Sequence, residues 1–263
     1  MRKFLQIATW IILIAGVIAA LGFVNKKHTM QTFTTPEVDI DYETENRFVD
    51  EQDILRQVLG KADTGVLLLS RFDVNYLEEK LGNNSSIKDV QVYKTIDGKL
   101  KIKVKQRRPI LRVFSETDSY YIDEFGNLML CSPKYTSRLT VASGYLNEPY
   151  NKRYQLNYRE LPDSIAEKTL LDDIYRIANY IDQSEFWKAQ IEQIYVNKVS
   201  DIELVPKVGN HKIVFGGVEN LESKFEKLML FYQKGLSKTG WNEYSEINLK
   251  YKNQVVCTKR YIE

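Results

Sequence analysis

The chain has 263 residues, of which 37 are Lys or Arg and 35 are Asp or Glu, so its formal net charge is +2. A hydrophobic fraction of 43% and a charged fraction of 27% exclude a disordered, collagen-like or multi-span membrane protein. The near-neutral charge gives no electrostatic case for nucleic acid as a partner, and only two His residues make a His-based enzyme or a zinc site a poor interpretation.

An uncharged apolar segment, residues 4–24, lies at the start of the chain. As a helix it would be about 31 Å long, close to the hydrocarbon thickness of a bilayer. It therefore predicts a single transmembrane helix, with residues 1–3 as a cytoplasmic stub and residues 25–35 as a polar linker. The flanking charges are nearly balanced, so orientation follows from the short stub, which favours translocation of the C-terminal part. A cleaved signal peptide is the competing interpretation, although its apolar core is usually roughly 7–15 residues.

Residues 36–109 predict a small domain with the order strand, helix, helix, strand, strand. Alternation over 36–42 indicates the first strand. Asp50 is the expected cap of a helix that ends at Gly60, and a second helix is expected from about 70–73 to Gly82. A small sheet with two helices on one face buries this pattern. The expected apolar helix positions are Ile54, Leu55, Val58, Leu59, Val74, Leu77 and Leu81.

A hairpin is expected over residues 87–106. A two-residue turn would place Val90 on the lysine face, whereas a three-residue loop over 96–98 pairs Val90 with Val104 and Val92 with Ile102. The second arrangement buries one apolar face, and Gly98 suits the left-handed position of such a loop. The opposite face of the second strand carries Lys99, Lys101, Lys103 and Lys105.

Residues 110–263 predict a mostly antiparallel β-domain with two helices. The helices are expected over 163–181 and from Asn220 to Lys234, with Gly235 at the end of the second one. The stretch 145–190 reads as an insert between strands. The expected strands are 111–114, 120–123, 128–130, 140–143, 193–196, 202–205, 212–215 and 246–251.

Several short motifs occur in the order of a known family. Residues 83–94 and 100–110, ending in Gln106-Arg107-Arg108-Pro109, resemble the POTRA domain and the Val-x-[Glu/Gln]-Arg-x-Pro junction of the bacterial FtsQ/DivIB cell-division proteins. Residues 120–126 resemble the family's aromatic-x-Asp-x-x-Gly hairpin. Phe215-Gly216-Gly217 before a helix resembles its C-terminal part, and residues 248–251, Asn-Leu-Lys-Tyr, correspond to its usual Asp-Leu-Arg-Tyr.

This resemblance implies an α+β protein with one transmembrane helix, a POTRA domain over 36–109 and a β-domain over 110–263. It implies a non-enzymatic, single-pass divisome scaffold at the division septum, with both domains outside the cytoplasmic membrane. The implied partners are FtsB- and FtsL-type proteins, bound by strand addition to a late exposed strand. The implied partner-binding residues are Asn248, Leu249, Lys250, Tyr251, Val255, Val256 and Thr258.

Other interpretations remain open from the sequence alone. Residues 248–258 could form a strand that only closes the sheet, and the chain could be another membrane-anchored POTRA adaptor or chaperone of envelope assembly. The stripe from Lys99 to Lys105 could be a solvated face or could bind an acidic partner or anionic lipid. Cys131 and Cys257 could be bridged outside the cytoplasm, although two separate small buried residues are the simpler interpretation.

A remote alternative is a penicillin-binding-type serine enzyme. Ser85 to Lys88 fits Ser-x-x-Lys, Tyr145 to Asn147 fits Tyr-x-Asn, and Lys238 to Gly240 fits Lys-Thr-Gly. That chemistry needs the serine at the start of a buried helix and Lys-Thr-Gly on an inner strand, and neither context is expected here. We expect no catalytic, cofactor-binding or metal-binding residues and no small-molecule substrate, because no phosphate-binding or nucleophile-elbow motif is present.

Overall fold

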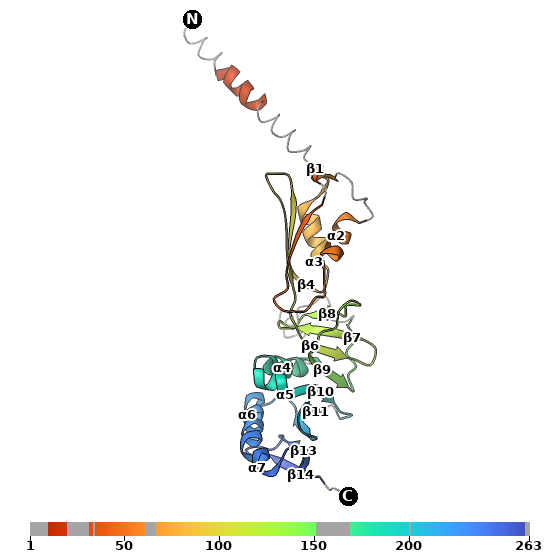
Figure 1. Ribbon diagram of the computed structural model, residues 1–263, viewed down its shortest axis with the longest axis vertical. Helices are drawn as coiled ribbons and strands as arrows, with labels where there is room; N and C mark the ends of the chain where they lie inside the picture. Colours follow the sequence, from red (N-terminus) through yellow and green to blue (C-terminus); the bar gives the residue numbers. More distant parts are fainter. Residues whose placement is uncertain are drawn as a thin grey trace. The chain divides into compact units, whose positions relative to one another are not determined.

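The computed structural model describes residues 10–19, 32–33, 35–60, 67–150, 169–199 and 201–260 (Figure 1). The chain divides into two compact units, residues 1–107 and 108–263. Residues 10–19 are helical, and the rest of the expected transmembrane segment 4–24 lies outside the described residues, as do the expected stub and most of the expected linker. Within the described ranges, no helix combines the length and apolar character needed to cross a bilayer. The transmembrane helix therefore stays a prediction.

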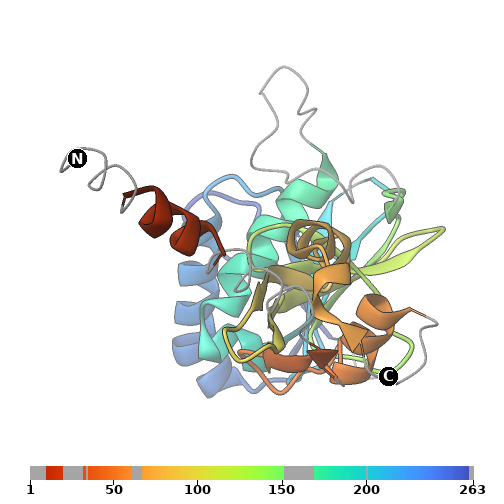
Figure 2. The same cartoon turned by 90° about the horizontal axis from the view of Figure 1, so that it is seen from above.

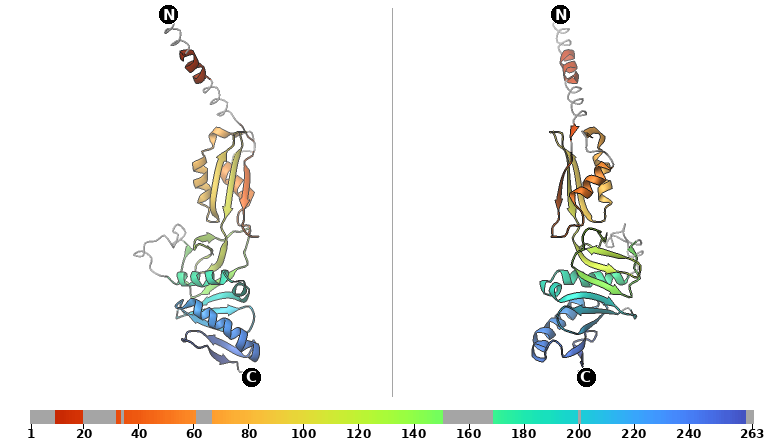
Figure 3. Two further views of the ribbon diagram at one scale, coloured as in Figure 1. Left: turned by 90° about the vertical axis from the view of Figure 1, so that its left-hand side faces the viewer. Right: turned by 45° about the vertical axis from the view of Figure 1, so that its right-hand side comes forward.

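The first unit has the predicted order of elements. It contains β2 (Glu37–Asp41), α2 (Glu51–Leu59), α3 (Val74–Gly82), β4 (Ile87–Lys94) and β5 (Leu100–Gln106). The strands form a sheet in the order β2-β5-β4, and both helices lie against one of its faces (Figure 3). Apart from the helical residues 10–19, the other described elements of this unit are a short pair, β1 (Thr32–Phe33) with β3 (Leu67–Leu68), and the 3-10 turn η1 (Leu69–Arg71).

The helix ends and the hairpin register are confirmed. The Asp50 side chain accepts the Asp53 N–H in a capping box at the start of α2, and the Asp73 side chain accepts the Tyr76 N–H at the start of α3. In the hairpin, Val92 pairs with Ile102 and Val90 pairs with Val104, and Gly98 has φ +86°. Burial of one apolar face thus selected the three-residue loop.

Gln106 joins the end of β5 to the loop before α2. Its side chain is completely buried. Its Oε1 accepts the backbone N–H groups of Phe48 at 2.8 Å and Val49 at 3.2 Å, and its Nε2 donates to the Asn46 carbonyl at 3.1 Å. This one amide satisfies three backbone groups of a loop far away in sequence, because buried polar groups need partners.

We predict that Gln106→Leu lowers the free energy of unfolding of the first unit by about 2–4 kcal/mol, because two buried N–H groups lose their acceptor. Urea unfolding of the chain measures this loss. Gln91→Leu is the matched control, since Gln91 is exposed on β4 and its replacement should change stability by less than about 0.5 kcal/mol. Equal effects of the two substitutions would contradict the role given to Gln106.

The second unit is built on one nine-stranded sheet in the order β14-β13-β12-β11-β10-β9-β6-β7-β8. Five of the strand junctions are antiparallel, as expected for most of the sheet, and β6-β9, β9-β10 and β12-β13 are parallel. The strands are β6 (Pro109–Phe114), β7 (Ser119–Asp123), β8 (Leu128–Leu130), β9 (Thr140–Gly144), β10 (Ile191–Val196), β11 (Ile202–Pro206), β12 (Lys212–Gly216), β13 (Tyr244–Asn248) and β14 (Val256–Lys259).

The helices of the second unit are α4 (Leu170–Asp182), α5 (Glu185–Gln190), α6 (Leu221–Phe231), the π-helical turn η4 (Tyr232–Leu236) and α7 (Ser237–Thr239). Helices α4 and α6 lie side by side (Figure 2), and the rings of Tyr180 and Phe225 stack between them at 4.4 Å. One continuous core joins these helices to the sheet, with Ile194, Leu204 and Phe215 among its fully buried members.

Two helix predictions in this unit are wrong. Helix α5 was not expected, and residues 163–168 of the expected helix lie outside the described residues, as does the whole stretch 151–168 of the expected insert. Gly235 does not end the helix that begins after Asn220. The chain stays helical to Thr239 because Leu236 is buried, and Gly235 fits inside the turn because a Cβ there would lie 2.7 Å from the Phe231 ring.

Arg108 forms the main ion-pair network of the second unit. Its guanidinium binds both carboxylate oxygens of Asp182 at 3.1 and 2.8 Å and donates to Glu124 from Nε at 3.0 Å. Burial is the largest single influence and by itself raises the pKa of Asp182, but the hydrogen bonds and positive charges of Arg108 and Lys188 together outweigh it, and the pKa of that carboxyl is lowered. The pair ties the start of β6 to the end of α4.

We predict that Asp182→Asn lowers the free energy of unfolding at pH 7 by about 1–3 kcal/mol, because the nearly buried carboxylate accepts a bidentate bond. Lys188→Gln is the control, since Lys188 reaches the same carboxylate at 3.2 Å but is half-exposed. We expect it to cost less than about 1 kcal/mol in denaturant unfolding. A larger loss for Lys188→Gln than for Asp182→Asn would be inconsistent with this network.

Candidate partner-binding edge

Strand β14 lies at one end of the nine-stranded sheet. It pairs antiparallel with β13 and has no second neighbour among the described strands (Figure 1). Asn248 pairs with Val256, Ile247 with Cys257 and Glu246 with Thr258. The missed feature is a hairpin: the structure has two strands joined by a turn over 249–255, where one strand over 246–251 was expected.

The direction of the β14 backbone groups follows from the pairing. The Arg260 N–H donates to the Glu243 carbonyl at 2.9 Å, so the alternate positions Thr258 and Val256 also direct their N–H groups toward β13. Cys257 and Lys259 therefore direct their N–H and C=O groups away from the sheet. These outward groups are the donors and acceptors that an added strand would use.

The predicted site residues divide into two groups. Tyr251, Val256 and Thr258 are exposed, with 50% of Tyr251 and 41% of Val256 accessible to solvent. Leu249 is fully buried in the core, so its side chain does not face a partner. Val255 is half-buried against the same core, and Asn248 is the last residue of β13.

Lys250 does not lie on a strand, because its backbone N–H donates to the Asn248 side chain at 3.0 Å and β13 ends there. Its Nζ binds Asp201 at 2.6 Å, and this hydrogen bond raises the pKa of Lys250. Its aliphatic stem crosses Gly216, which has φ +73° and where a Cβ would lie 2.9 Å from Lys250 Cγ. Lys250 is thus a positioning residue for the turn.

Two lysines of α6, neither of them among the predicted site residues, also hold this part of the sheet. Lys227 Nζ donates to the carbonyls of Leu249 at 3.1 Å and Tyr251 at 2.8 Å. Lys224 is buried and donates to the carbonyls of Phe215 at 2.9 Å and Gly217 at 2.7 Å, and burial lowers the pKa of Lys224. The sequence feature that could have predicted these contacts is the spacing of the two lysines, because residues three apart in a helix lie on one face.

His211 is buried near the end of β14. Its Nε2 shares a hydrogen bond of 3.1 Å with the Tyr232 hydroxyl, and Nδ1 has no hydrogen-bond partner among the described residues. Burial lowers the pKa of His211, and the positive charge of Arg260 lowers it further, whereas the nearby backbone of Trp241 acts in the opposite direction. The folded unit therefore favours neutral His211.

We predict that the free energy of unfolding decreases as the pH is lowered below about 6.5, the ordinary pKa of a histidine side chain. Between that value and the lowered folded pKa, the unfolded chain binds a proton that the folded chain rejects, so the free energy of unfolding decreases as the pH drops. Thermal unfolding between pH 7.5 and 5 measures the slope. His211→Gln keeps a donor for Tyr232 and should flatten the slope, and an unchanged slope would rule out His211 as its source.

The lysine stripe of the first unit is largely neutralised within the fold. Strand β2 lies parallel to β5, so that Glu37 pairs with Lys101, Asp39 with Lys103 and Asp41 with Lys105. Glu37 contacts both Lys99 and Lys101, the latter at 3.0 Å, and Lys105 reaches Glu43 at 2.5 Å. The hydrogen bonds from Lys99 and Lys101 lower the pKa of Glu37. This charge ladder supports the solvated-face interpretation.

The structure shows no disulfide between the two cysteines and does not give the serine-enzyme motif the setting that its chemistry needs. Cys131 and Cys257 are both free and half-buried. Ser85 lies in a turn before β4 and not at a helix start, and Lys238 lies in α7 and not on a strand or in the loop that was expected. Both requirements of penicillin-binding chemistry are therefore unmet. The described residues also contain no cluster of His, Cys, Asp or Glu suited to a metal ion.

The fold defines a class of protein with a POTRA-type α+β unit followed by a mixed sheet with an open edge. A family model for a POTRA-like domain matches residues 34–105, and the model described as FtsQ/DivIB, C-terminal related, matches residues 108–258. The second match covers more than half of the chain, and the chain belongs to the FtsQ/DivIB family. The family is one of division-related membrane proteins that are generally non-enzymatic scaffolds. No curated protein matches the sequence significantly.

Proposed function

We propose that this protein is a non-enzymatic scaffold of bacterial cell division, anchored by residues 4–24, with both units outside the cytoplasmic membrane. The family supports a division role and interaction with other division proteins. The open edge of β14 is the observation that favours binding over catalysis. We propose that partners of the FtsB and FtsL type add a strand to this edge, and that Tyr251, Val256 and Thr258 contact them.

The chemistry of the other sheet edges favours β14. The three-stranded sheet has two edges, β2 and β4. Both carry charged side chains, which discourage an incoming strand: Glu37, Asp39 and Asp41 on β2, and Lys88, Asp89 and Lys94 on β4. Strand β8 offers only residues Leu128–Leu130. Strand β14 has a solvent-exposed face formed by Val256 and Thr258, and its hairpin is braced by Lys227 and Lys250. A braced strand loses less conformational entropy when a partner pairs with it.

We predict that Lys259→Pro abolishes co-purification of the FtsB- and FtsL-type partners, because proline removes an outward N–H while the inward ladder to β13 remains. Lys259→Ala is the matched control, since it keeps the N–H and loses only an exposed side chain whose ion pair with Glu243 spans 3.7 Å. We expect the alanine variant to bind within about twofold of the unsubstituted protein.

Circular dichroism and thermal unfolding must show that Lys259→Pro keeps its fold. Wild-type partner binding by a folded Lys259→Pro variant would contradict strand addition at β14. Midcell enrichment of a fluorescent fusion separates the division role from a general envelope adaptor, since the adaptor would give a uniform envelope signal.

A further inference from the structure

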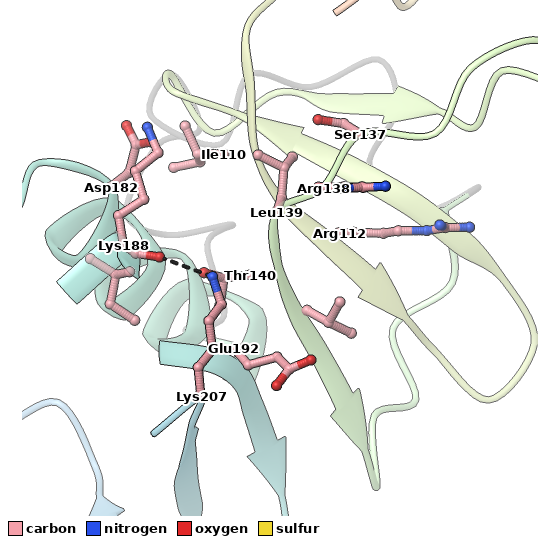
Figure 4. A pocket seen from close by; sticks show the side chains of 12 residues that line it. Ile110, Arg112, Ser137, Arg138, Leu139, Thr140, Asp182, Lys188, Glu192 and Lys207 are labelled. Atoms are coloured by element: carbon pink, nitrogen blue, oxygen red, sulfur yellow. Dashed lines mark hydrogen bonds and ion pairs between the residues drawn. The ribbon is translucent and has the colours of Figure 1, made fainter. Parts of the chain in front are cut away.

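A pocket of about 390 Å³ lies in the second unit, on strands other than β14 (Figure 4). It is formed at the start of the parallel strands β6, β9 and β10 and at the end of α4. Ile110, Leu139 and Ile181 give it an apolar part. Most of the remaining lining side chains are charged, and cations outnumber carboxylates among them.

Four cationic side chains line this pocket, against the two acids Asp182 and Glu192. Asp182 is already bound by Arg108 in bidentate fashion and by Lys188. Arg112 and Arg138 form no ion pair with any described residue, and in Figure 4 both point to the same side, away from Asp182 and Lys188. No described carboxylate neutralises these two guanidinium groups, so both can donate charge-assisted hydrogen bonds to an anion.

Arg112 is held in place by aromatic rings. Its guanidinium carbon lies 4.6 Å from the centre of the Phe114 ring and 5.5 Å from that of Tyr121. Its Nε is buried and has no acceptor among the described residues. A planar guanidinium held against aromatic faces is preorganised to bind an oxyanion through its terminal N–H groups.

We propose that this pocket binds a phosphate group, held by Arg112 and Arg138, with the apolar part of the ligand against Ile110 and Leu139. A phosphate suits two unpaired arginines better than a carboxylate does, because it offers more acceptor oxygens and up to two negative charges. The phosphate comes either from an anionic phospholipid headgroup or from a soluble phosphate compound.

Isothermal titration calorimetry of the full chain in a non-ionic detergent tests the proposal. The probes are inorganic phosphate, and short-chain phosphatidylglycerol and phosphatidylcholine as soluble monomers, all at constant ionic strength. We expect saturable phosphate binding that Arg138→Gln weakens about tenfold, because a charge-assisted bond is lost. Arg112→Lys should weaken it as well, because a lysine keeps the charge and loses the stacked fork.

Arg176→Gln is the matched control, because Arg176 is exposed on α4 and does not line the pocket. Its binding should equal that of the unsubstituted chain. Tighter binding of phosphatidylglycerol than of phosphate, with none of phosphatidylcholine, identifies a lipid headgroup as the source, and the reverse order identifies a soluble phosphate. Absence of saturable binding to both phosphate and phosphatidylglycerol, or equal weakening by Arg138→Gln and Arg176→Gln, would overturn the proposal.

Discussion

The hydrogen-bonding capacity of one sheet edge is the constraint on which the proposed function depends. A backbone edge that faces water can accept another strand, and natural proteins usually shorten, charge or cover such edges. Here β2 and β4 are charged and β8 is short, whereas β14 carries Val256 and Thr258 on its exposed face. This contrast among the edges is the reason why we propose β14 as the surface that pairs with a partner.

The rest of the second unit supports that edge. Lys227 and Lys250 fasten the turn between β13 and β14 to α6 and to Asp201, and Leu249 anchors it in the core. Lys224 closes the Phe215–Gly217 turn just before α6. These contacts are made by lysines with carbonyl and carboxylate oxygens, so the hairpin is braced from within the unit, and no described strand lies beside the outward groups of β14. The Arg112–Arg138 pocket lies on different strands, and binding there would not occupy β14.

Local patterns predicted the first unit well, because each of its elements is specified by short-range chemistry. The caps at Asp50 and Asp73 and the alternation over Leu100, Ile102 and Val104 fixed the helix starts and the register. Contacts between distant residues were not predictable in this way. No pattern around Gln106 indicates that it satisfies the Asn46–Val49 loop, and none around Lys250 indicates Asp201 as its partner. The β13–β14 hairpin was missed because polar and apolar residues alternate without interruption over 246–251, which predicted one strand, whereas the chain turns after Asn248.

Amide hydrogen exchange, resolved for single residues of β14, tests strand addition most directly. Val256 and Thr258 should be protected in the protein alone, because their N–H groups point to β13, whereas Cys257 and Lys259 should exchange freely. Addition of the FtsB- and FtsL-type partners should then protect Cys257 and Lys259. If these two amides exchange equally fast with and without bound partner, the partner does not extend the sheet at β14.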